Sequence, residues 1–354
     1  IYLEGGGACM SQHFCDHNPQ NMTTVFPSGS LNGESFAGSL FTQAGLQAPY
    51  TTGIFDNTNP SNPFQTWNEI YIPYCTGDAH FGTNDDGGVE DTNTGMVTNP
   101  GQHFMGYRNM QKFISRIVPT FKSVDYVVLT GSSAGGLGAG LNYGLVQDTF
   151  GSTHVDLIDD SFPPFTGQLI ASCLQGIVIP LWGMDKSIPA DCAECQQDAG
   201  GLANIIVYWH HKYPKAHAGL ISSIHDQIIR LFLAAGQPNP PPLSASPAVP
   251  CGDTDPNTLS NLALSGSDVP SFDGGMYENG LDGLRTLYGC TNVLSTYYIG
   301  SGDPDASDQN GTIDTLHEHL FRDRFYDPLA GPGKPSLAAW VGAFVQGNLS
   351  QTGP

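Results

Sequence analysis

Short runs of apolar residues alternate along the chain with segments in which apolar residues recur at helical spacing. The runs with the β-branched and aromatic content of buried strands are residues 1–3, 67–75, 126–130, 155–158, 216–223 and 295–300. Helical spacing marks residues 104–118, 137–145, 202–209, 226–232 and 336–347. Strands and helices in this order predict an α/β fold, a largely parallel sheet with helices on both faces. We expect residues 67–75 at the buried centre of the sheet and residues 295–300 as its last strand.

One long segment breaks this alternation. Residues 237–275 are rich in Pro, Ser and Asn and show neither helical nor strand periodicity. Long irregular segments in a compact domain are often lids or rims over a site, and Cys251 and Cys290 could close this one. We therefore expect a single domain over residues 1–354 with a Pro-rich lid or rim insertion at about 237–290.

The charge balance disfavours two classes of partner. The 354 residues include 33 acidic and 12 basic side chains, for a net charge of −21. Binding to nucleic acid or to an anionic membrane surface needs clustered Lys and Arg, which this chain lacks. The chain also lacks an apolar run of the roughly 18 residues that a membrane span requires. We expect a monomer that does not insert into membranes.

The cysteine content indicates the compartment. The chain has 8 cysteines together with 44 glycines and 26 prolines, and an even number of cysteines in a loop-rich chain favours disulfides and secretion. The chain opens inside a predicted strand without a signal peptide, so we expect upstream residues in the natural protein. Cys192 and Cys195 have the spacing of half a zinc site, but no second ligand pair is evident nearby.

The strongest chemical signal is the stretch from residue 125 to residue 140. A predicted strand runs directly into Gly-Ser-Ser-Ala-Gly at residues 131–135, and a helix of small residues follows. Strand, sharp turn and helix form the context in which G-x-S-x-G marks a catalytic nucleophile. The glycines permit the turn, and the helix N-terminus behind it favours developing negative charge. The pattern predicts Ser133 as the nucleophile.

A serine nucleophile needs a base and an acid that orients the base. In this fold they follow the nucleophile in the order Asp or Glu, then His, on loops after later strands. Asp226 follows the strand predicted at 216–223, and His317 follows the strand predicted at 295–300. We therefore predict the triad Ser133, Asp226 and His317.

Other residues compete for two of these roles. His319 lies two positions after His317 and is the alternative base. Asp159 and Asp160 end an earlier strand, where a triad acid can also stand, and are the alternative acids.

An early glycine triplet supplies the predicted oxyanion hole. Esters are cleaved through an oxyanion that main-chain N–H groups stabilise, one from the residue after the nucleophile and others from an early Gly-rich loop. Ala134 follows Ser133, and Gly6 and Gly7 lie in the triplet after the first predicted strand. We predict these three residues as the donors.

A calcium-like pattern precedes the predicted base. Acidic residues alternate between 303 and 314 and surround an Asn-Gly pair. A calcium loop also needs its first ligand and its last Glu, which are missing here. A solvated acidic turn before His317 is the preferred interpretation.

Several motifs within residues 1–160 carry a family resemblance. They are Leu-Glu-Gly-Gly-Gly-Ala-Cys at 3–9, Ile-Pro-Tyr-Cys at 72–75, Phe-Met-Gly at 104–106 and Gly-Ser-Ser-Ala-Gly-Gly at 131–136. Together they resemble the pectin acetylesterase and Notum family of α/β-hydrolase-fold serine esterases. The resemblance implies an α/β-hydrolase fold and a carboxylester hydrolase with Ser133 as nucleophile and Gly6, Gly7 and Ala134 as oxyanion donors. It further implies a Cys9–Cys15 disulfide and an upstream partner for Cys75 that this chain lacks.

These observations predict a secreted serine carboxylester hydrolase that forms an acyl-enzyme and needs no metal or organic cofactor. The resemblance favours acetyl groups on a polysaccharide such as pectin as the substrate. The alternative is a longer-chain or polymeric ester, such as a lipid or polyester, which an apolar pocket beside Ser133 would favour. A non-catalytic binding protein on the same fold is disfavoured, because nucleophile, acid, base and oxyanion loop all occur in order.

Overall fold

The computed structural model of the chain describes the core of the fold and every predicted catalytic residue. The residues described are 1–10, 51–90, 97–99, 102–121, 123–165, 169–170, 172–196, 201–234, 274–289, 294–300, 317–329 and 332–353. The predicted calcium-like segment at 303–314 lies outside them. So do Cys15, Cys251, Cys290 and the Pro-rich segment 237–273.

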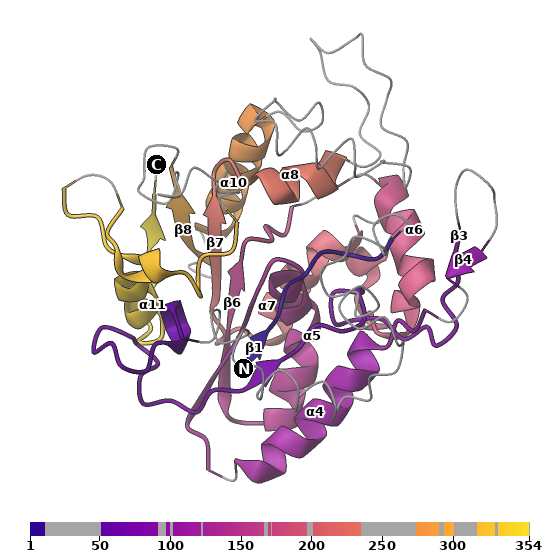
Figure 1. Cartoon of the computed structure of the whole chain (residues 1–354), viewed down its shortest axis with the longest axis horizontal. Coiled ribbons are helices and arrows are strands. Elements are labelled where there is room, and N and C mark those ends of the chain that lie inside the picture. The colour runs from indigo at the N-terminus through magenta and orange to yellow at the C-terminus, as the bar shows by residue number, and fades with distance from the viewer. Residues whose placement is uncertain are drawn as a thin grey trace.

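A seven-stranded sheet forms the centre of the molecule (Figure 1). Its order is β2-β1-β5-β6-β7-β8-β9, and every pairing between neighbours is parallel. The strands are β1 (Tyr2–Leu3), β2 (Tyr71–Ile72), β5 (Tyr126–Ser132), β6 (His154–Asp160), β7 (Ala218–Ser223), β8 (Leu294–Ile299) and β9 (Gln351–Thr352). Because all strands run the same way, their carboxyl ends share one edge, where ligands bind in open α/β sheets.

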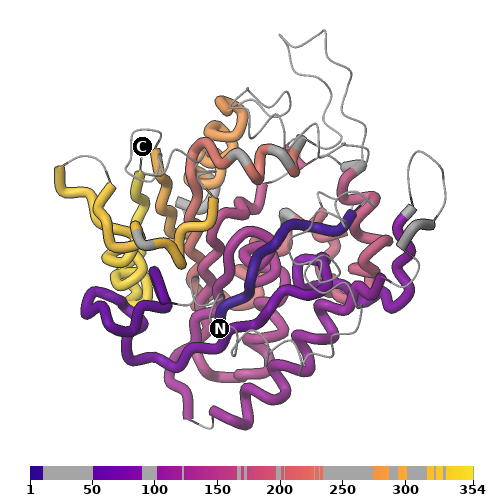
Figure 2. Tube along the Cα trace, viewed as in Figure 1, coloured from indigo at the N-terminus to yellow at the C-terminus, as the bar shows by residue number. Residues whose placement is uncertain are grey.

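Helices cover both faces of this sheet. They are α4 (Gly106–Thr120), α5 (Ala134–Phe150), α6 (Ser172–Trp182), α7 (Ile205–Lys212), α8 (Gln227–Ala234), α10 (Gly274–Gly289) and α11 (Leu337–Phe344). The chain starts at β1, inside the sheet, and ends beside β8 (Figure 2). Among the described residues, no helix has both the length and the apolar character that crossing a membrane requires.

Alternation along the central strands creates two separate cores. Leu129 and Leu157 point into a core shared with α4, α5 and α7, whereas Val128 and Ile158 point into a second core shared with α11. Successive side chains of a strand face opposite sides, so a fully apolar strand supplies both cores at once. The predicted fold, an α/β-hydrolase fold with helices on both faces, is confirmed.

The structure corrects the predicted strands at both edges of the sheet. Of residues 67–75 only β2 is extended, and it lies at the edge of the described sheet rather than in its centre. Asn68 and Glu69 are exposed, and Pro73 has no N–H to donate to a neighbouring strand. At the other edge, β9 follows β8, so residues 295–300 are not the last strand.

Part of the segment predicted as a lid or rim insertion is helical. Residues 274–289 lie within that insertion and form α10, whose Tyr277, Leu281 and Leu284 are buried in the core. Glycines within this segment obscured the helical spacing. A small antiparallel pair, β3 (Val89–Glu90) and β4 (Val97–Asn99), precedes α4.

Helix α5 packs closely because glycines line it. A Cβ at Gly135 would lie 2.1 Å from the carbonyl oxygen of Leu3, and one at Gly144 would lie 2.3 Å from Cη2 of Trp209. The Trp209 indole is held in place by its N–H, which donates to the carbonyl of Gly140 at 2.9 Å. Close approach of β1 and α7 to α5 therefore requires glycine at these positions.

The Gly144→Ala substitution should destabilise the fold by about 1–3 kcal/mol, the usual cost of overpacking a core. Gly283→Ala in α10 is the matched control, because a Cβ there meets nothing within 4 Å. That control should be neutral or stabilising by up to about 1 kcal/mol. Urea unfolding of both variants measures the difference, and equal midpoints would contradict the packing argument.

Candidate active site

Ser133 occupies the sharp turn between β5 and α5. Its φ of 56° and ψ of −125° lie outside the regions that L-residues favour, and the side chain is buried. The turn is held by the Ser133 N–H, which donates to the carbonyl of Asp160 at 2.8 Å. Glycine at position 131 is required, because a Cβ there would lie 2.4 Å from the carbonyl oxygen of Gly135. Strained backbone of this kind is typical of nucleophile turns.

Asp226 and His317 are in direct contact. Asp226 follows β7, and its Oδ2 lies 2.7 Å from Nδ1 of His317, with both side chains buried. The other carboxylate oxygen accepts the N–H of Ile229 at 2.9 Å and so fixes the start of α8. Among the described residues, Nε2 of His317 has no hydrogen-bond partner. The imidazole is thus oriented at one nitrogen and available at the other.

Residues after His317 meet the Ser133 turn at Gly5. A Cβ at Gly5 would lie 3.0 Å from Cβ of Ser133 and 2.6 Å from Oε1 of Glu318. Glu318 adopts a left-handed φ of 63°, an unusual conformation for this residue type. The segment that carries His317, the nucleophile turn and the glycine triplet therefore converge on one place.

Electrostatic interactions change the pKa of His317. Burial lowers this pKa, but the charge and hydrogen bond of Asp226, with further contributions from Glu318 and Asp160, raise it above the ordinary value of 6.5. Burial raises the pKa of Glu318, and the nearby His317 partly offsets this effect. The site thus holds a histidine whose protonated form is favoured by surrounding carboxylates.

Asp160, predicted as an alternative acid, connects the strand ends to the His317 segment. Its Oδ2 accepts hydrogen bonds from the Ser132 hydroxyl at 2.7 Å, the His319 N–H at 2.7 Å and the Leu320 N–H at 2.9 Å. Its Oδ1 accepts from the Ser161 hydroxyl at 2.8 Å. These contacts give Asp160 an anchoring role, which its position at a strand end alone did not indicate.

Asp159 and His319, the remaining alternative residues, form other hydrogen bonds. Asp159 accepts the N–H of Phe162 at 3.1 Å, and burial, reinforced by Asp160, raises its pKa well above the ordinary value. His319, the alternative base, is buried and gives its main-chain N–H to Asp160. Within the described part of the chain, Asp226 is the carboxylate that hydrogen-bonds the His317 ring.

The glycine triplet, residues 5–7, lies beside the Ser133 turn and is held there by a hydrogen bond. Gly6 and Gly7 have φ values of 148° and 82°, which favour glycine. The Tyr74 hydroxyl donates to the Gly7 carbonyl at 3.0 Å and accepts the Ala79 N–H at 2.9 Å. Within the described residues, the N–H groups of Gly6, Gly7 and Ala134 donate to no main-chain carbonyl. Tyr74 was part of a sequence motif, but its bracing role was not predicted.

The cysteines are used in three ways. Cys192 and Cys195 form a disulfide with a Cα–Cα distance of 5.3 Å, so they are not a thiolate pair for zinc. Cys9 is disulfide-bonded, and its predicted partner Cys15 lies outside the described residues. The Trp182 indole N–H donates to the Cys9 carbonyl at 2.7 Å and adds a second brace there. Cys75 is a free, exposed thiol.

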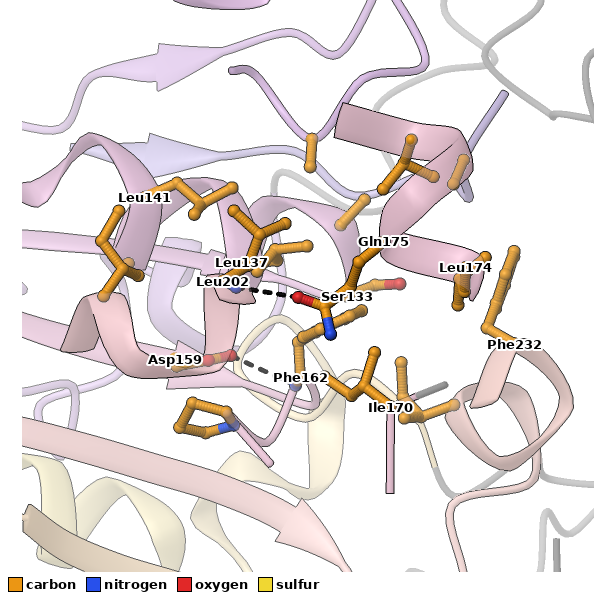
Figure 3. A pocket seen from close by; sticks show the side chains of 18 of the residues that line it. Ser133, Leu137, Leu141, Asp159, Phe162, Ile170, Leu174, Gln175, Leu202 and Phe232 are labelled. Atoms are coloured by element: carbon orange, nitrogen blue, oxygen red, sulfur yellow. Dashed lines mark hydrogen bonds between the residues drawn. The ribbon is translucent and has the colours of Figure 1, made fainter. Parts of the chain in front are cut away.

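An apolar cavity opens at Ser133 (Figure 3). Its empty volume is about 970 Å³, part of it open to solvent, and hydrocarbon side chains dominate its walls. Two of the polar side chains that line it accept main-chain hydrogen bonds: Gln175 from the Leu202 N–H at 3.0 Å and Asp159 from the Phe162 N–H at 3.1 Å. The apolar lining includes Leu137, Leu141, Ile170, Leu174, Val178 and Phe232. Such a wall fits a hydrocarbon chain better than a sugar.

Comparisons with known proteins place the chain in a family and give it relatives. The sequence profile of the family described as Pectinacetylesterase matches residues 1–203. The palmitoleoyl-protein carboxylesterase NOTUM of Schmidtea mediterranea is 31% identical over 145 residues, which are 40% of this chain and 23% of that protein. The palmitoleoyl-protein carboxylesterase notum2 of Xenopus laevis is 30% identical over 156 residues, 42% of this chain and 27% of that protein. The chain thus spans less than a third of the length of either relative.

A solved structure shares the fold. The Wnt deacylase Notum from Drosophila matches with a TM-score of 0.57 and 17% sequence identity. The match covers 99% of this chain and 86% of that one.

Replacing Asp160 by Ala should cost several kcal/mol of stability, because each buried donor left unpaired costs about 1–3 kcal/mol. Asp160→Asn should cost less, since its amide oxygen can still accept from Ser132, His319 and Leu320 while its NH₂ faces the Ser161 hydroxyl. The exposed Asp125→Ala is the control and should change stability by less than about 0.5 kcal/mol. Thermal and urea unfolding rank the three variants. If Asp160→Ala lowers stability no more than the control does, the anchoring role of Asp160 is refuted.

Proposed function

Since the chain belongs to the pectinacetylesterase family, which with its relatives comprises carboxylic ester hydrolases, we propose that it hydrolyses an ester through Ser133. One observation carries this proposal: His317, which contacts the buried Asp226, directly precedes Glu318, and Glu318 and Ser133 both lie against Gly5. The order along the chain, nucleophile, acid and base, is that of α/β hydrolases.

The reaction proceeds through an acyl-enzyme. The Ser133 hydroxyl oxygen attacks the ester carbonyl carbon, while Nε2 of His317 takes the hydroxyl proton. Asp226 keeps Nδ1 of the ring protonated and stabilises the imidazolium that forms. Collapse of the tetrahedral intermediate breaks the bond to the alcohol oxygen, which leaves with the proton from His317. Water, deprotonated by the same imidazole, then releases the acid.

Main-chain N–H groups stabilise the oxyanion. Gly6, Gly7 and Ala134 are the proposed donors, and each well-placed donor is worth about 3–4 kcal/mol in the transition state. The Tyr74 hydroxyl donates to the carbonyl of Gly7 and so holds this residue. The Cys9 disulfide and the Trp182 indole restrain Cys9, two residues further along the chain. Their rigidity matters, because a misplacement of about 1 Å can cost roughly 100-fold in rate.

We assign the apolar cavity to the acyl part of the substrate. Its walls adjoin Ser133, Ala134 and Gly7, so an acyl chain bound there has its carbonyl at the nucleophile. The favoured substrate is therefore an ester of a medium or long hydrocarbon acid. The relatives in planarian and frog are named palmitoleoyl-protein carboxylesterases, which supports this assignment. Acetyl groups on a polysaccharide are the second candidate, supported by the name of the family.

The disulfides support a location outside the reducing cytosol. Cys192 and Cys195 are bonded to each other, and Cys9 is also disulfide-bonded. Disulfides persist mainly in secreted proteins and oxidising compartments, so we propose that the protein is secreted.

Substitution of the reacting residues tests the reaction itself. Ser133→Ala should abolish hydrolysis of p-nitrophenyl esters and labelling by a fluorophosphonate probe, with little change in thermal stability. Asp226→Asn should keep the fold but lower kcat by about four orders of magnitude, because the ring loses its correct tautomer. Absence of labelling in the unmodified protein would instead support a non-catalytic binding protein.

A series of p-nitrophenyl esters from acetate to palmitate tests the acyl assignment. Each CH₂ buried in the cavity contributes about 0.8 kcal/mol, so kcat/KM should rise by up to about fourfold per carbon until the cavity is full. Ile170→Trp, which fills the cavity, should reduce turnover of long esters while sparing acetate. Phe113→Trp on the exposed face of α4 is the control. A preference for acetate, unchanged by Ile170→Trp, would favour deacetylation of a polysaccharide.

The pH profile should follow the ionisation of His317. The base must be neutral to accept a proton, so kcat/KM should fall as pH falls through its pKa. Because that pKa is raised, the midpoint of the acidic limb should lie above 6.5. Glu318→Gln removes one of the charges that raise the pKa, so it should move the midpoint to lower pH. A midpoint unaffected by this substitution would mean that another group governs the limb.

A further inference from the structure

A second cluster of chemically capable side chains lies at the opposite edge of the sheet from Ser133. His154 is the first residue of β6 and Asp156 the third, so both point to the same face. His217 directly precedes β7, whose Ala218 pairs with Leu157, and this register places His217 beside Asp156. Asp156 lies four residues before Asp160 in β6, so at about 3.3 Å per residue about 13 Å of strand separates the cluster from the Ser133 edge.

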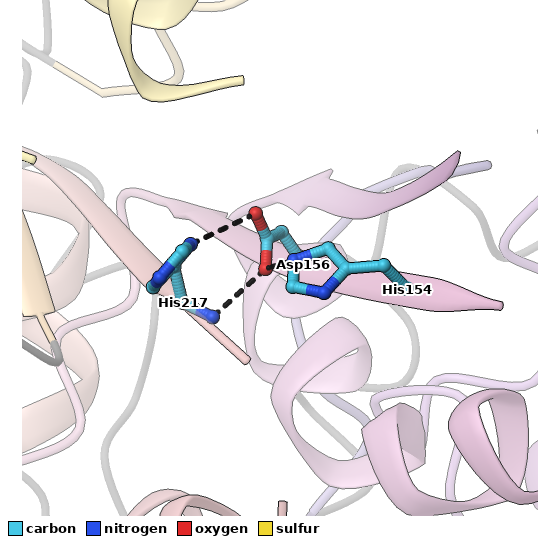
Figure 4. Close-up of side chains that lie close together, drawn as sticks. All are labelled: His154, Asp156 and His217. Carbon is cyan, nitrogen blue, oxygen red and sulfur yellow. Dashed lines mark hydrogen bonds and ion pairs between the residues drawn. The ribbon is translucent and has the colours of Figure 1, made fainter. Parts of the chain in front are cut away.

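The three side chains present their donor atoms to one another (Figure 4). Nε2 of His154 lies 2.7 Å from Oδ1 of Asp156, and Nδ1 of His217 lies 3.3 Å from Oδ2. One ligand atom from each residue lies within 4.8 Å of the other two. The Asp156 side chain is fully buried, whereas those of His154 and His217 are 33% and 30% exposed, so solvent reaches the cluster from the histidine side.

Other residues fix the donor atoms in place. The Tyr126 hydroxyl donates to Oδ2 of Asp156, and the main-chain N–H of His217 donates to Oδ1 at 2.8 Å. The Tyr126 ring stacks on the His154 ring, with centroids 5.1 Å apart and planes 17° from parallel. Hydrogen-bonded carboxylates and oriented imidazoles of this kind surround metal ligands in proteins.

The buried carboxylate also needs a positive partner. A buried charge is costly unless it is paired or coordinates a metal. Within the described part of the chain, both ion pairs of Asp156 are with these histidines, and neither Lys nor Arg takes part. A cation held between the carboxylate and the two rings would supply this partner.

We propose that His154, Asp156 and His217 bind one divalent transition-metal ion of the zinc class. Two imidazole nitrogens and one carboxylate oxygen suit zinc and its first-row neighbours, rather than magnesium or calcium. Ligand atoms about 2.0–2.1 Å from a tetrahedral zinc ion lie roughly 3.3 Å apart. The separation between His217 and Asp156 has this value, whereas the 2.7 Å between His154 and Asp156 would lengthen when an ion enters. Water completes the coordination. The ion joins the first residues of β6 to the start of β7 and takes no part in ester hydrolysis.

Calorimetric titration of the full chain, stripped with EDTA, with zinc chloride tests this site. We expect one ion per chain with micromolar or tighter affinity, and a rise in the unfolding temperature when zinc is added. Cobalt(II) at the same site should give the visible absorption of a low-coordinate ion. Magnesium and calcium should not compete. Absence of binding, or equal binding of calcium, would overturn the proposal.

Variants locate the ion. The double substitution His154→Ala and His217→Ala should weaken zinc binding at least 100-fold. The control is His210→Ala with His211→Ala, an adjacent pair on α7 that forms no metal-ligand cluster within the described residues, and it should leave zinc binding unchanged. If the double variant fails to fold, zinc binding is measured on the single variant His154→Gln, whose ring is partly exposed. Unchanged affinity in either cluster variant would place the ion elsewhere and refute the assignment. Esterase activity should persist in both variants and after EDTA, so failure of this proposal is distinct from failure of the proposed function.

Discussion

The arrangement of the candidate active site depends on one buried residue, Asp160. Its carbonyl accepts the N–H of Ser133, and its carboxylate accepts the N–H groups of His319 and Leu320 and the hydroxyl of Ser132. A residue at the end of β6 therefore positions both the Ser133 turn and the segment that carries His317. Hydrogen bonds to a buried carboxylate are strong and directional, so the two parts cannot shift independently without leaving a buried group unpaired.

The parallel sheet separates the chemistry of its two edges. At the carboxyl edge, glycines allow β1, the Ser133 turn and Glu318 to approach closely, and an apolar cavity opens beside them. At the amino edge, His154, Asp156 and His217 form a cluster of quite different character. The same strand, β6, carries Asp160 at one end and Asp156 at the other. The length of β6 separates the carboxylates of Asp156 and Asp160, so each takes part in its own set of contacts.

Reactivity and substrate preference also have different structural origins. The nucleophile turn and the Asp226–His317 pair suit ester hydrolysis in general. The cavity walls, contributed by α5, α6, α7 and α8, bear on which acyl group fits. Because hydrocarbon side chains dominate these walls, burial of a long acyl chain there would remove more apolar surface from water than burial of an acetyl group.

The sequence alone determined the features that depend on local order. Alternating apolar periods predicted the α/β fold, and the Gly-Ser-Ser-Ala-Gly turn predicted where Ser133 stands, because strand, turn and helix are encoded by adjacent residues. Asp226 and His317 could be selected by their order after later strands, and their contact agrees with that choice. Only the tertiary structure decided the rest. The anchoring by Asp160, the apolar cavity and the His154–Asp156–His217 cluster each combine residues distant along the chain, and contacts of that kind depend on strand register and helix packing. No local pattern carries that information, because register and packing arise only when the whole sheet assembles.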